Sequence, residues 1–338
     1  MRHTLSAIVL LALPAFAAAD DVSIAVGKDA IEFKAGSTVV AKYVTAQSAA
    51  KPYLYPVLAP NGVPVTRGWP MEPAPEMGTK DHVHQKSVWF CHGDVIPEGV
   101  DLKVKTTERG GKGVDFWSEA KDESGPRHGK IVVTKVGEPK QVAKNHASVE
   151  THNEWRTPDG VKIMDEVRTI HFIDMKEGRL FGFDITLKAT ACPITFGDTK
   201  EGSFGIRVRD ELRMEKKKGL IPGEGVMTNS EGKSGEKDIW GYPAEWVDYS
   251  GKIDGKEVGV AVFSAPSNPT PSWHARGYGL VGANPFGRER SGFPSQKGKT
   301  DLLKIEKGGE MKLKYGVYAH TGDVKGGKVA EAYSEFKK

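Results

Sequence analysis

The chain has 338 residues, with 48 Lys and Arg against 44 Asp and Glu and a formal net charge of +4 at pH 7. The basic residues are interspersed with acidic ones and form no basic block, so nucleic acid is not an expected partner. A content of 38% hydrophobic and 27% charged residues is typical of a globular protein, and 40 glycines suit many tight turns between strands.

The N-terminus has the features of a secretory signal peptide. An apolar run at residues 5–16 follows Arg2, and an A-x-A cleavage site ends at Ala19. This run is too short to span a bilayer, and no other run approaches the roughly 20 apolar residues that a membrane helix needs. We therefore expect residues 1–19 to be removed and residues 20–338 to form a single β-sandwich domain. The mature protein is expected to be periplasmic or secreted, without membrane insertion.

Alternating apolar and polar residues predict strands along most of the chain. Residues 22–26, 31–33 and 39–43 alternate and are separated by short turn clusters, which predicts a β-meander. Asn61-Gly62 predicts a turn, and residues 66–80, rich in Pro, Met and Gly, predict a long surface loop. Further strands are predicted at residues 131–136, 146–155, 161–172, 180–189, 203–209, 258–263 and 312–318.

This spacing of strands predicts the fold class. Turn residues recur about every ten positions and a period of 3.6 residues is nearly absent, which favours an all-β fold, a large antiparallel β-sandwich with few helices. Only residues 328–338 have a helical pattern. The two cysteines, Cys91 and Cys192, are predicted to be buried thiols, because free cysteine is often buried. A disulfide between them is the alternative in an oxidising compartment.

Residues 81–94 are the first candidate functional stretch. They hold three of the ten histidines, two carboxylates and a Trp-Phe pair. His82 and His84 are two residues apart, so on a strand both would project to one face and could converge on one ligand or metal. A pair of surface or hydrogen-bonded histidines is the alternative interpretation. Further candidates within or soon after this stretch are His92, Asp94, Asp115 and Trp117.

Residues 273–287 are the second candidate stretch and would have to meet the first in the fold. They contain His274, Arg276, Tyr278 and Asn284. Prolines and glycines in and around the stretch predict a loop at the rim of the site rather than a buried strand. For Arg276 the alternative is a structural ion pair with a carboxylate such as Asp94 or Asp115.

Several catalytic motifs are missing from the sequence. It lacks a G-x-S-x-G nucleophile elbow, a G-x-G-x-x-G dinucleotide fingerprint after a strand, and an H-E-x-x-H zinc motif. A scattered His and Asp site for zinc or copper remains an alternative. Because the histidines define no full set of ligands, we predict no metal and no other cofactor.

General acid–base chemistry at an exposed cleft is the remaining interpretation, because imidazole titrates near neutral pH. Trp89, Trp117 and Trp273 are predicted to be flat apolar walls, which suit the C–H face of a sugar, although core packing is the alternative for each. A small-molecule or glycan ligand is therefore the expected partner. The predicted catalytic residues are His82, His84 and His274. The predicted substrate-binding residues are Trp89, His92, Asp94, Asp115, Trp117, Arg207, Arg276, Tyr278 and Asn284.

A set of motifs resembles a family of exported bacterial proteins labelled PmoA-like, or methane oxygenase. The motifs are Tyr55-Pro56, Asn61-Gly62, Pro64-Val65-Thr66, Asp81-His82-x-His84, Trp89-Phe90-x-His92-Gly93-Asp94, Asp115-Phe116-Trp117, Gly205-Ile206-Arg207-Val208, Trp273-His274-Ala275-Arg276-Gly277-Tyr278-Gly279-Leu280 and Asn284-Pro285-Phe286-Gly287. The label implies a subunit of a membrane enzyme, which we reject because no segment could span the membrane. The family is better regarded as uncharacterised. In layout it resembles the galactose-mutarotase-like β-supersandwich, whose enzymes act on carbohydrates with histidine and carboxylate acid–base pairs.

Two positions depart from the pattern of that family. Gln85 stands where a third histidine often follows His84, and Ser264-Ala265-Pro266 stands where Asp-His-Pro is often found. The leading hypothesis is an exported carbohydrate-active enzyme of epimerase, hydrolase or lyase type. The departures support the alternative of a non-catalytic glycan-binding module, and a metal-dependent enzyme with histidine ligands is the third hypothesis.

Overall fold

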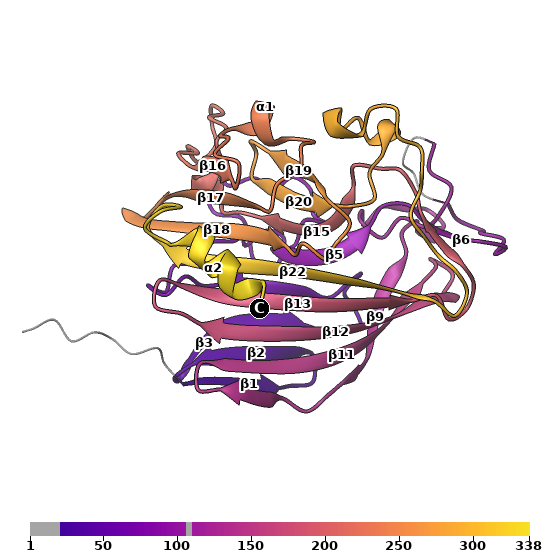
Figure 1. Ribbon diagram of the computed structural model, residues 1–338, viewed down its shortest axis with the longest axis horizontal. Helices are drawn as coiled ribbons and strands as arrows, with labels where there is room; N and C mark the ends of the chain where they lie inside the picture. Colours follow the sequence, from indigo (N-terminus) through magenta and orange to yellow (C-terminus); the bar gives the residue numbers. More distant parts are fainter. Residues whose placement is uncertain (1–20, 106–109) are drawn as a thin grey trace, which may run out of the picture.

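The computed structural model describes residues 21–105 and 110–338 (Figure 1). The predicted signal peptide lies outside the described residues. Strands dominate the described chain, and each pairing between neighbouring strands in it is antiparallel. Two large sheets hold most of these strands, so the predicted all-β sandwich is confirmed.

The first sheet has eight strands and begins with the predicted meander. The strands β1, β2 and β3 pair in sequence, as expected from their alternation. In spatial order the sheet contains β1 (Val22–Val26), β2 (Ala30–Ala35), β3 (Thr38–Val44), β4 (Tyr53–Val57), β5 (Val88–His92), β15 (Gly202–Arg207), β20 (Leu280–Asn284) and β19 (Ser272–Arg276).

The second sheet has nine strands and includes the longest ones. In spatial order it contains β10 (Lys140–Ala143), β11 (His146–Arg156), β12 (Lys162–Asp174), β13 (Gly178–Lys188), β22 (Glu310–Thr321), β18 (Lys256–Ser264), β17 (Trp246–Ile253) and β16 (Val226–Asn229), and β9 (Lys130–Val136) pairs with β11. The smaller elements are β6 (Val95–Pro97), β14 (Ile194–Phe196) and β21 (Lys304–Ile305) in one sheet, β7 (Lys121–Asp122) with β8 (Gly125–Pro126), the helices α1 (Glu236–Ile239) and α2 (Val329–Phe336), and the 3₁₀ turns η1 (Asp210–Leu212), η2 (Glu289–Ser291) and η3 (Pro294–Gln296).

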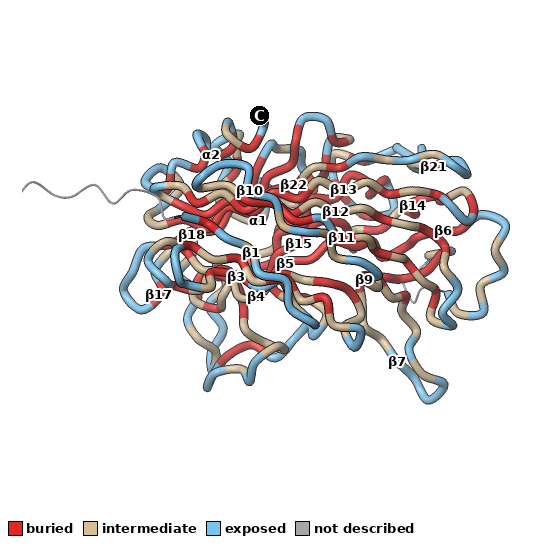
Figure 2. Tube along the Cα trace, turned by 90° about the horizontal axis from the view of Figure 1, so that it is seen from below, coloured by how far each residue is buried: buried red, intermediate tan, exposed pale blue. Residues whose placement is uncertain are grey.

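Aromatic side chains join the two sheets. Phe33 of β2 makes edge contacts with Phe172 and Phe181 of the second sheet, at ring-centre distances of 6.1 and 5.6 Å. Phe204 of β15 stacks on Tyr315 of β22 at 4.9 Å. Figure 2 shows the buried segments running through the middle of the molecule, with exposed segments at the loops. The core therefore lies between the sheets, where apolar burial contributes most to stability.

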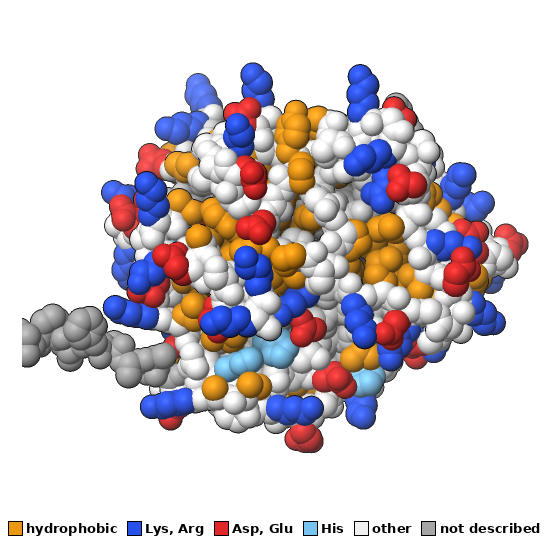
Figure 3. Space-filling model, in the orientation of Figure 1, with side chains coloured by type: hydrophobic (Ala, Val, Ile, Leu, Met, Phe, Trp, Pro, Cys, Tyr) orange, Lys and Arg blue, Asp and Glu red, His pale blue; other side chains and the backbone are white. Residues whose placement is uncertain are grey.

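The C-terminal helix covers part of the outer face of the second sheet (Figure 1). Tyr333 and Phe336 of α2 pack against Phe263 of β18, at ring-centre distances of 5.4 and 5.6 Å. This confirms the helix predicted for the C-terminus. On the face of the molecule in Figure 3, Lys and Arg side chains are interspersed with Asp and Glu, in agreement with the charge pattern of the sequence.

The prediction of a rim loop at residues 273–287 is wrong. This segment includes most of β19 and all of β20, which pair with each other and join β15 as buried strands. The prolines do not interrupt them, since Pro269 and Pro271 precede β19 and Pro285 follows β20. Both cysteines are buried and free, so the predicted pair of buried thiols is confirmed.

Candidate functional site

One face of the first sheet carries a row of four paired residues across four neighbouring strands. Trp89 pairs with Gly205, Gly205 with Gly282, and Gly282 with His274. Residues paired across antiparallel strands project to the same face, so Trp89 and His274 flank a strip of sheet without side chains. A Cβ atom at position 205 would lie 2.8 Å from Cζ2 of Trp89, which shows that the indole lies across this glycine.

Arg207 lies one step along the same face and organises the polar groups above it. Its side chain is fully buried, and its two Nη atoms donate to Asp81 Oδ1 at 2.9 Å and to Gln85 Oε1 at 2.6 Å. Its Cζ lies 4.6 Å from the ring centre of Tyr278, a cation–π contact. Burial, together with the charge of Arg67, lowers the pKa of Arg207 to about 10, so it stays charged at neutral pH.

Asp81 and His82 form a carboxylate–imidazole pair at the surface. Asp81 Oδ1 accepts hydrogen bonds from Arg67 and Arg207, and its Oδ2 lies 3.1 Å from His82 Nδ1. Burial alone would raise the pKa of Asp81, but the bond to His82 and the charges of Arg207 and Arg67 hold it well below its usual range. An ionised carboxylate accepts the proton of Nδ1, which leaves the lone pair on Nε2 of His82. The His82 side chain is 39% exposed.

The two candidate stretches meet at His82, as the sequence analysis requires. The His82 ring stacks on Tyr278 at 5.2 Å and meets the edge of His84 at 5.6 Å. The strand geometry expected for His82 and His84 is wrong, because residues 81–87 form no strand. Instead the Gln85 amide donates to the His82 carbonyl at 2.9 Å, and His82 has a φ of +43°, so a turn brings the two rings together.

His84 and His274 are neutral imidazoles at pH 7. Burial lowers the pKa of His84 to about 3, with the charges of Lys51 and His82 acting in the same direction. Burial likewise lowers the pKa of His274 to about 3, with contributions from Arg276 and Lys200. His274 Nδ1 is buried and has no hydrogen-bond partner among the described residues.

The three tryptophans predicted as walls lie on different faces. Trp89 and Trp117 meet edge to face at 5.2 Å, and Trp117 lies 6.4 Å from the His84 ring. Their indole nitrogens are buried without a partner in the described part of the chain. Trp273 projects to the core side of its strand, and its Nε1 donates to the Ala244 carbonyl at 3.0 Å. The interpretation of Trp273 as a wall of the site is therefore wrong.

Arg276 forms the ion pair that the sequence analysis left open, but with a different partner. Its Nε lies 2.9 Å from Glu236 Oε1 of α1, whereas Asp94 and Asp115 lie elsewhere with other partners. The Arg276 guanidinium also lies 5.9 Å from the ring centre of Tyr278. It therefore borders the cluster around His82 and is neutralised by α1.

Four predicted site residues bind neighbouring backbone groups instead of facing the residues around His82. His92 packs on the core side between Phe196 and Phe286, and its Nε2 lies 2.8 Å from the Gly197 carbonyl. The other three satisfy nearby backbone groups. Asp94 accepts from the amides of Lys112 and Gly113 and pairs with Arg290, Asp115 accepts from the amides of Trp117 and Ser118, and Asn284 donates to the carbonyls of Thr199 and Lys200.

The sequence patterns do not single out Arg67, Asp81 and Gln85 as site residues. Asp81 directly precedes His82, and this adjacency of carboxylate and imidazole is a signal that could have identified it. Gln85 is buried and bound by Arg207. Arg67 belongs to the long loop and donates to the carbonyls of Asp81 and His82, both at 3.1 Å. No sequence pattern predicts this contact.

No group of three or more His, Cys, Asp or Glu side chains within residues 21–105 and 110–338 is placed to hold a metal ion. In the same ranges, no helix is long and apolar enough to cross a membrane.

Comparison with known proteins assigns a family. A family model described as "Family of unknown function (DUF6807)" matches residues 30–334. The chain belongs to this family. The match confirms the expectation of an uncharacterised family, whereas the PmoA-like label stays a prediction. No curated protein matches the sequence.

This member of the DUF6807 family is weakly similar to several solved structures. A galactose mutarotase-like protein from Clostridium acetobutylicum has a TM-score of 0.41 at 11% identity, over 90% of this chain and 99% of that one. A protein described as an aldose 1-epimerase from Escherichia coli K12 has a TM-score of 0.39 at 8% identity, over 89% and 99%. A glycoside hydrolase family 97 enzyme from Pseudoalteromonas sp. strain K8 has a TM-score of 0.37 at 10% identity, and the match covers 85% of this chain but only 35% of that one. These similarities are too weak to assign an activity.

Proposed function

We propose that this protein is a carbohydrate-active enzyme in which His82 is the general base. The observation that carries the proposal is the exposed imidazole whose Nδ1 lies 3.1 Å from the ionised Asp81 carboxylate. A carboxylate on one ring nitrogen fixes the tautomer and orientation of a histidine, so that the other nitrogen can accept a proton from a ligand. From the predicted signal peptide we also propose that the enzyme is exported.

The charges of the site favour an uncharged, hydroxylated ligand. Arg67 and Arg207 share the Asp81 carboxylate, and Arg276 is paired with Glu236, so no full charge is left without a partner at the centre of the cluster. The remaining groups are the imidazoles of His82 and His84 and the Tyr278 hydroxyl. Imidazole and phenol groups both donate and accept hydrogen bonds, as sugar hydroxyls do.

The neighbours of His82 would act as hydrogen-bond donors rather than as strong acids. Burial raises the pKa of Tyr278, so its hydroxyl keeps its proton at neutral pH. His84 is neutral at that pH and carries one N–H group. In a proton-transfer step, Nε2 of His82 would take a proton from the ligand while these groups bind the oxygen on which negative charge develops. Epimerisation, elimination and hydrolysis can each include such a step.

The test compares His82→Gln with a matched control, His152→Gln. His152 is also 39% exposed and lies 2.9 Å from a carboxylate, that of Glu150, but on the opposite side of the sandwich in β11. Turnover of a panel of free sugars and glycosides would be followed by NMR, which detects anomer exchange, release and elimination. Loss of general base catalysis is expected to reduce turnover about 10²–10⁴-fold in His82→Gln only. Equal turnover in the two variants would contradict the proposal.

A glycan-binding module is the second candidate, and one observation favours it. With pKa values of about 3, His84 and His274 offer no protonated partner to His82 at neutral pH. Calorimetry with the same sugars would separate the two candidates. Binding without turnover after long incubation favours the module, and any turnover that His82→Gln abolishes excludes it.

A further inference from the structure

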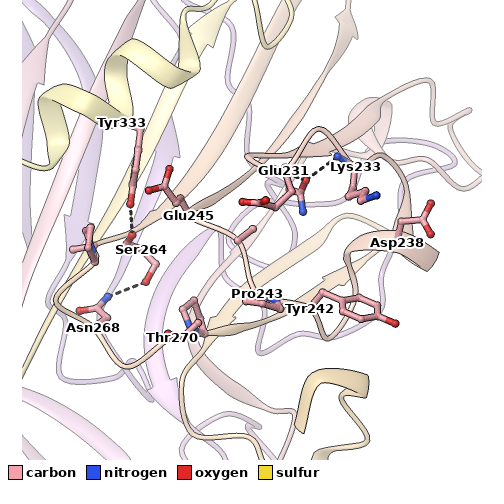
Figure 4. Close-up of a pocket in the computed structure, with 15 residues that line it drawn as sticks. Glu231, Lys233, Asp238, Tyr242, Pro243, Glu245, Ser264, Asn268, Thr270 and Tyr333 are labelled. Carbon is pink, nitrogen blue, oxygen red and sulfur yellow. Dashed lines mark hydrogen bonds between the residues drawn. The ribbon is translucent and has the colours of Figure 1, made fainter. Parts of the chain in front are cut away.

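A groove of about 690 Å³ lies beside the end of β18 and the helix α2 (Figure 4). It is formed by residues 229–245, by the segment that follows β18 and by Tyr333 of α2. No residue of the cluster around His82 lines it. Its volume falls within the range of small-molecule sites, about 300–1,000 Å³.

The floor of the groove is polar and firmly held. Ser264 accepts a hydrogen bond from Asn268 at 3.0 Å, and Tyr333 donates to the Ser264 carbonyl at 3.0 Å. Asn229 is only 3% exposed, and its Oδ1 accepts from the amides of Glu231 and Lys233. The Asn229 Nδ2 group donates to no described residue. This donor is not among the fully buried, unpartnered atoms, so it is open to the groove and can donate to a ligand there.

The charges around the groove are not neutralised by the protein. Glu231, Asp238, Glu245 and Lys233 line it, and none of them forms an ion pair with any residue in the described ranges. Three carboxylates and one ammonium give the groove a net charge of about −2. This contrasts with the centre of the cluster around His82, where each charged group has a partner. A cation is therefore attracted to the groove.

Apolar surface lines the groove beside these charges. Tyr242 is 43% exposed and lies next to Pro243 (Figure 4), and Ala265 and Pro271 also line the groove. A tyrosine face attracts both cations and the C–H face of a sugar ring. The ligand that satisfies all these groups has an ammonium for the carboxylates, hydroxyl groups for Asn229 and Lys233, and a compact C–H surface.

We propose that this groove is a second binding site, for a hydroxylated primary amine with the chemistry of an amino sugar. The proposal does not depend on the function assigned to His82. The ammonium would donate to the rim carboxylates, and the Asn229 amide would donate to a ligand hydroxyl. Tyr242 would pack against the ring of the ligand.

Calorimetry with three probes tests the proposal on the full chain. Glucosamine carries the ammonium and the hydroxyls, glucose lacks the ammonium, and cyclohexylamine lacks the hydroxyls. Glucosamine is expected to bind at least about 10-fold more tightly than either of the others, because a hydrogen bond to a charged group is stronger than one between neutral groups. Equal binding of all three probes, or no binding of glucosamine, would overturn the proposal.

Three variants locate the binding. Glu245→Gln is expected to weaken glucosamine binding about 10-fold, since it removes a rim carboxylate. The matched control is Glu123→Gln, an exposed carboxylate without an ion pair in the turn between β7 and β8, which should leave binding unchanged. His82→Gln should also leave it unchanged. Loss of binding in His82→Gln but not in Glu245→Gln would place the amine at His82 and contradict the groove assignment.

Discussion

At the scale of single residues, Asp81 connects most of the groups around His82. It accepts from Arg67 and Arg207, both of which are nearly or fully buried, and it holds His82 through Oδ2. Both guanidinium groups form an ion pair with this one carboxylate, and Asp210 adds a second negative charge nearby. The site is therefore an electrostatic unit and not a set of independent side chains.

Asp81→Asn is expected to affect activity and stability together. The amide keeps the shape of the carboxylate but removes the ion-pair partner of two buried guanidinium groups, which costs about 2 kcal/mol after allowance for the 43% exposure of Asp81. It also removes the acceptor that fixes His82. Thermal melting and the sugar assay would both fall, whereas the control Glu150→Gln should change neither. Unchanged activity in Asp81→Asn would show that His82 needs no carboxylate.

The burial of His274 as a neutral imidazole predicts how the free energy of unfolding depends on pH. In the unfolded chain an imidazole takes up its proton near pH 6.5, whereas His274 in the folded chain does so only near pH 3. Above about pH 6.5 the proton equilibrium of His274 does not lower the free energy of unfolding. As the pH falls from about 6.5 towards 3, the unfolded chain binds a proton that the folded chain does not, so the free energy of unfolding falls by about 1.4 kcal/mol per pH unit. His274→Gln should reduce the pH slope of the unfolding free energy by about one proton in this range. Urea titrations at several pH values measure it, and an unchanged slope would contradict the assignment of His274 as neutral.

At the scale of elements, the packing of the Trp89 side chain of β5 across β15 depends on Gly205. A Cβ at this position would lie 2.8 and 2.9 Å from Trp89 and 3.3 Å from Trp117. Gly205→Ala should displace both indoles and destabilise the fold by about 1–3 kcal/mol through overpacking. Melting temperature and tryptophan fluorescence would report this change. Gly137→Ala is the control, because its Cβ would meet only ordinary contacts from 3.4 Å outward. Equal melting temperatures in the two variants would contradict the packing of Trp89 over the glycine.

The strands that alternation predicts and those that it misses differ in burial. The strand β12 alternates between buried and partly exposed residues, because one of its faces packs in the core and the other lies at the surface. The strands β5 and β20 are buried at every position, since loops with the polar cluster cover their second face. A period of two requires one exposed face. Two strands that build the site, β5 and β20, were therefore not predicted, whereas β15, which is also buried at every position, was predicted at residues 203–209.

The candidate site was predictable only in part, for a related reason. Histidines crowded into one stretch indicate His82 and His84, and the meeting with Tyr278 follows if both stretches belong to one site. Arg67 could not be predicted, because its contacts depend on the path of a long loop without periodicity. Asp94 and Asp115 satisfy backbone amides, a role that residue type alone does not distinguish from catalysis.

At the scale of the whole molecule, the two cysteines report on different parts of the sandwich. Cys91 is fully buried in β5 of the first sheet, and Cys192 is 7% exposed and lies 3.9 Å from the Ile163 carbonyl of the second sheet. Burial raises the pKa of Cys91 to about 12, so little thiolate forms in the folded state. Burial also raises the pKa of Cys192.

Thiol labelling of single-cysteine variants is the whole-molecule test. Only the thiolate reacts, so Cys91 in Cys192→Ala should react solely through opening of the first sheet, at a rate set by the free energy of unfolding. Cys192 in Cys91→Ala should react faster, because it lies in the segment between β13 and β14 and keeps 7% exposure, so that local opening suffices. When the parent chain is unfolded without a reductant, the labelling reagent should detect two reactive thiols. Detection of no thiol would demonstrate the disulfide that the sequence analysis gave as an alternative. Fast labelling of Cys91 under native conditions would show that the sheet beneath the site opens independently of the rest of the fold.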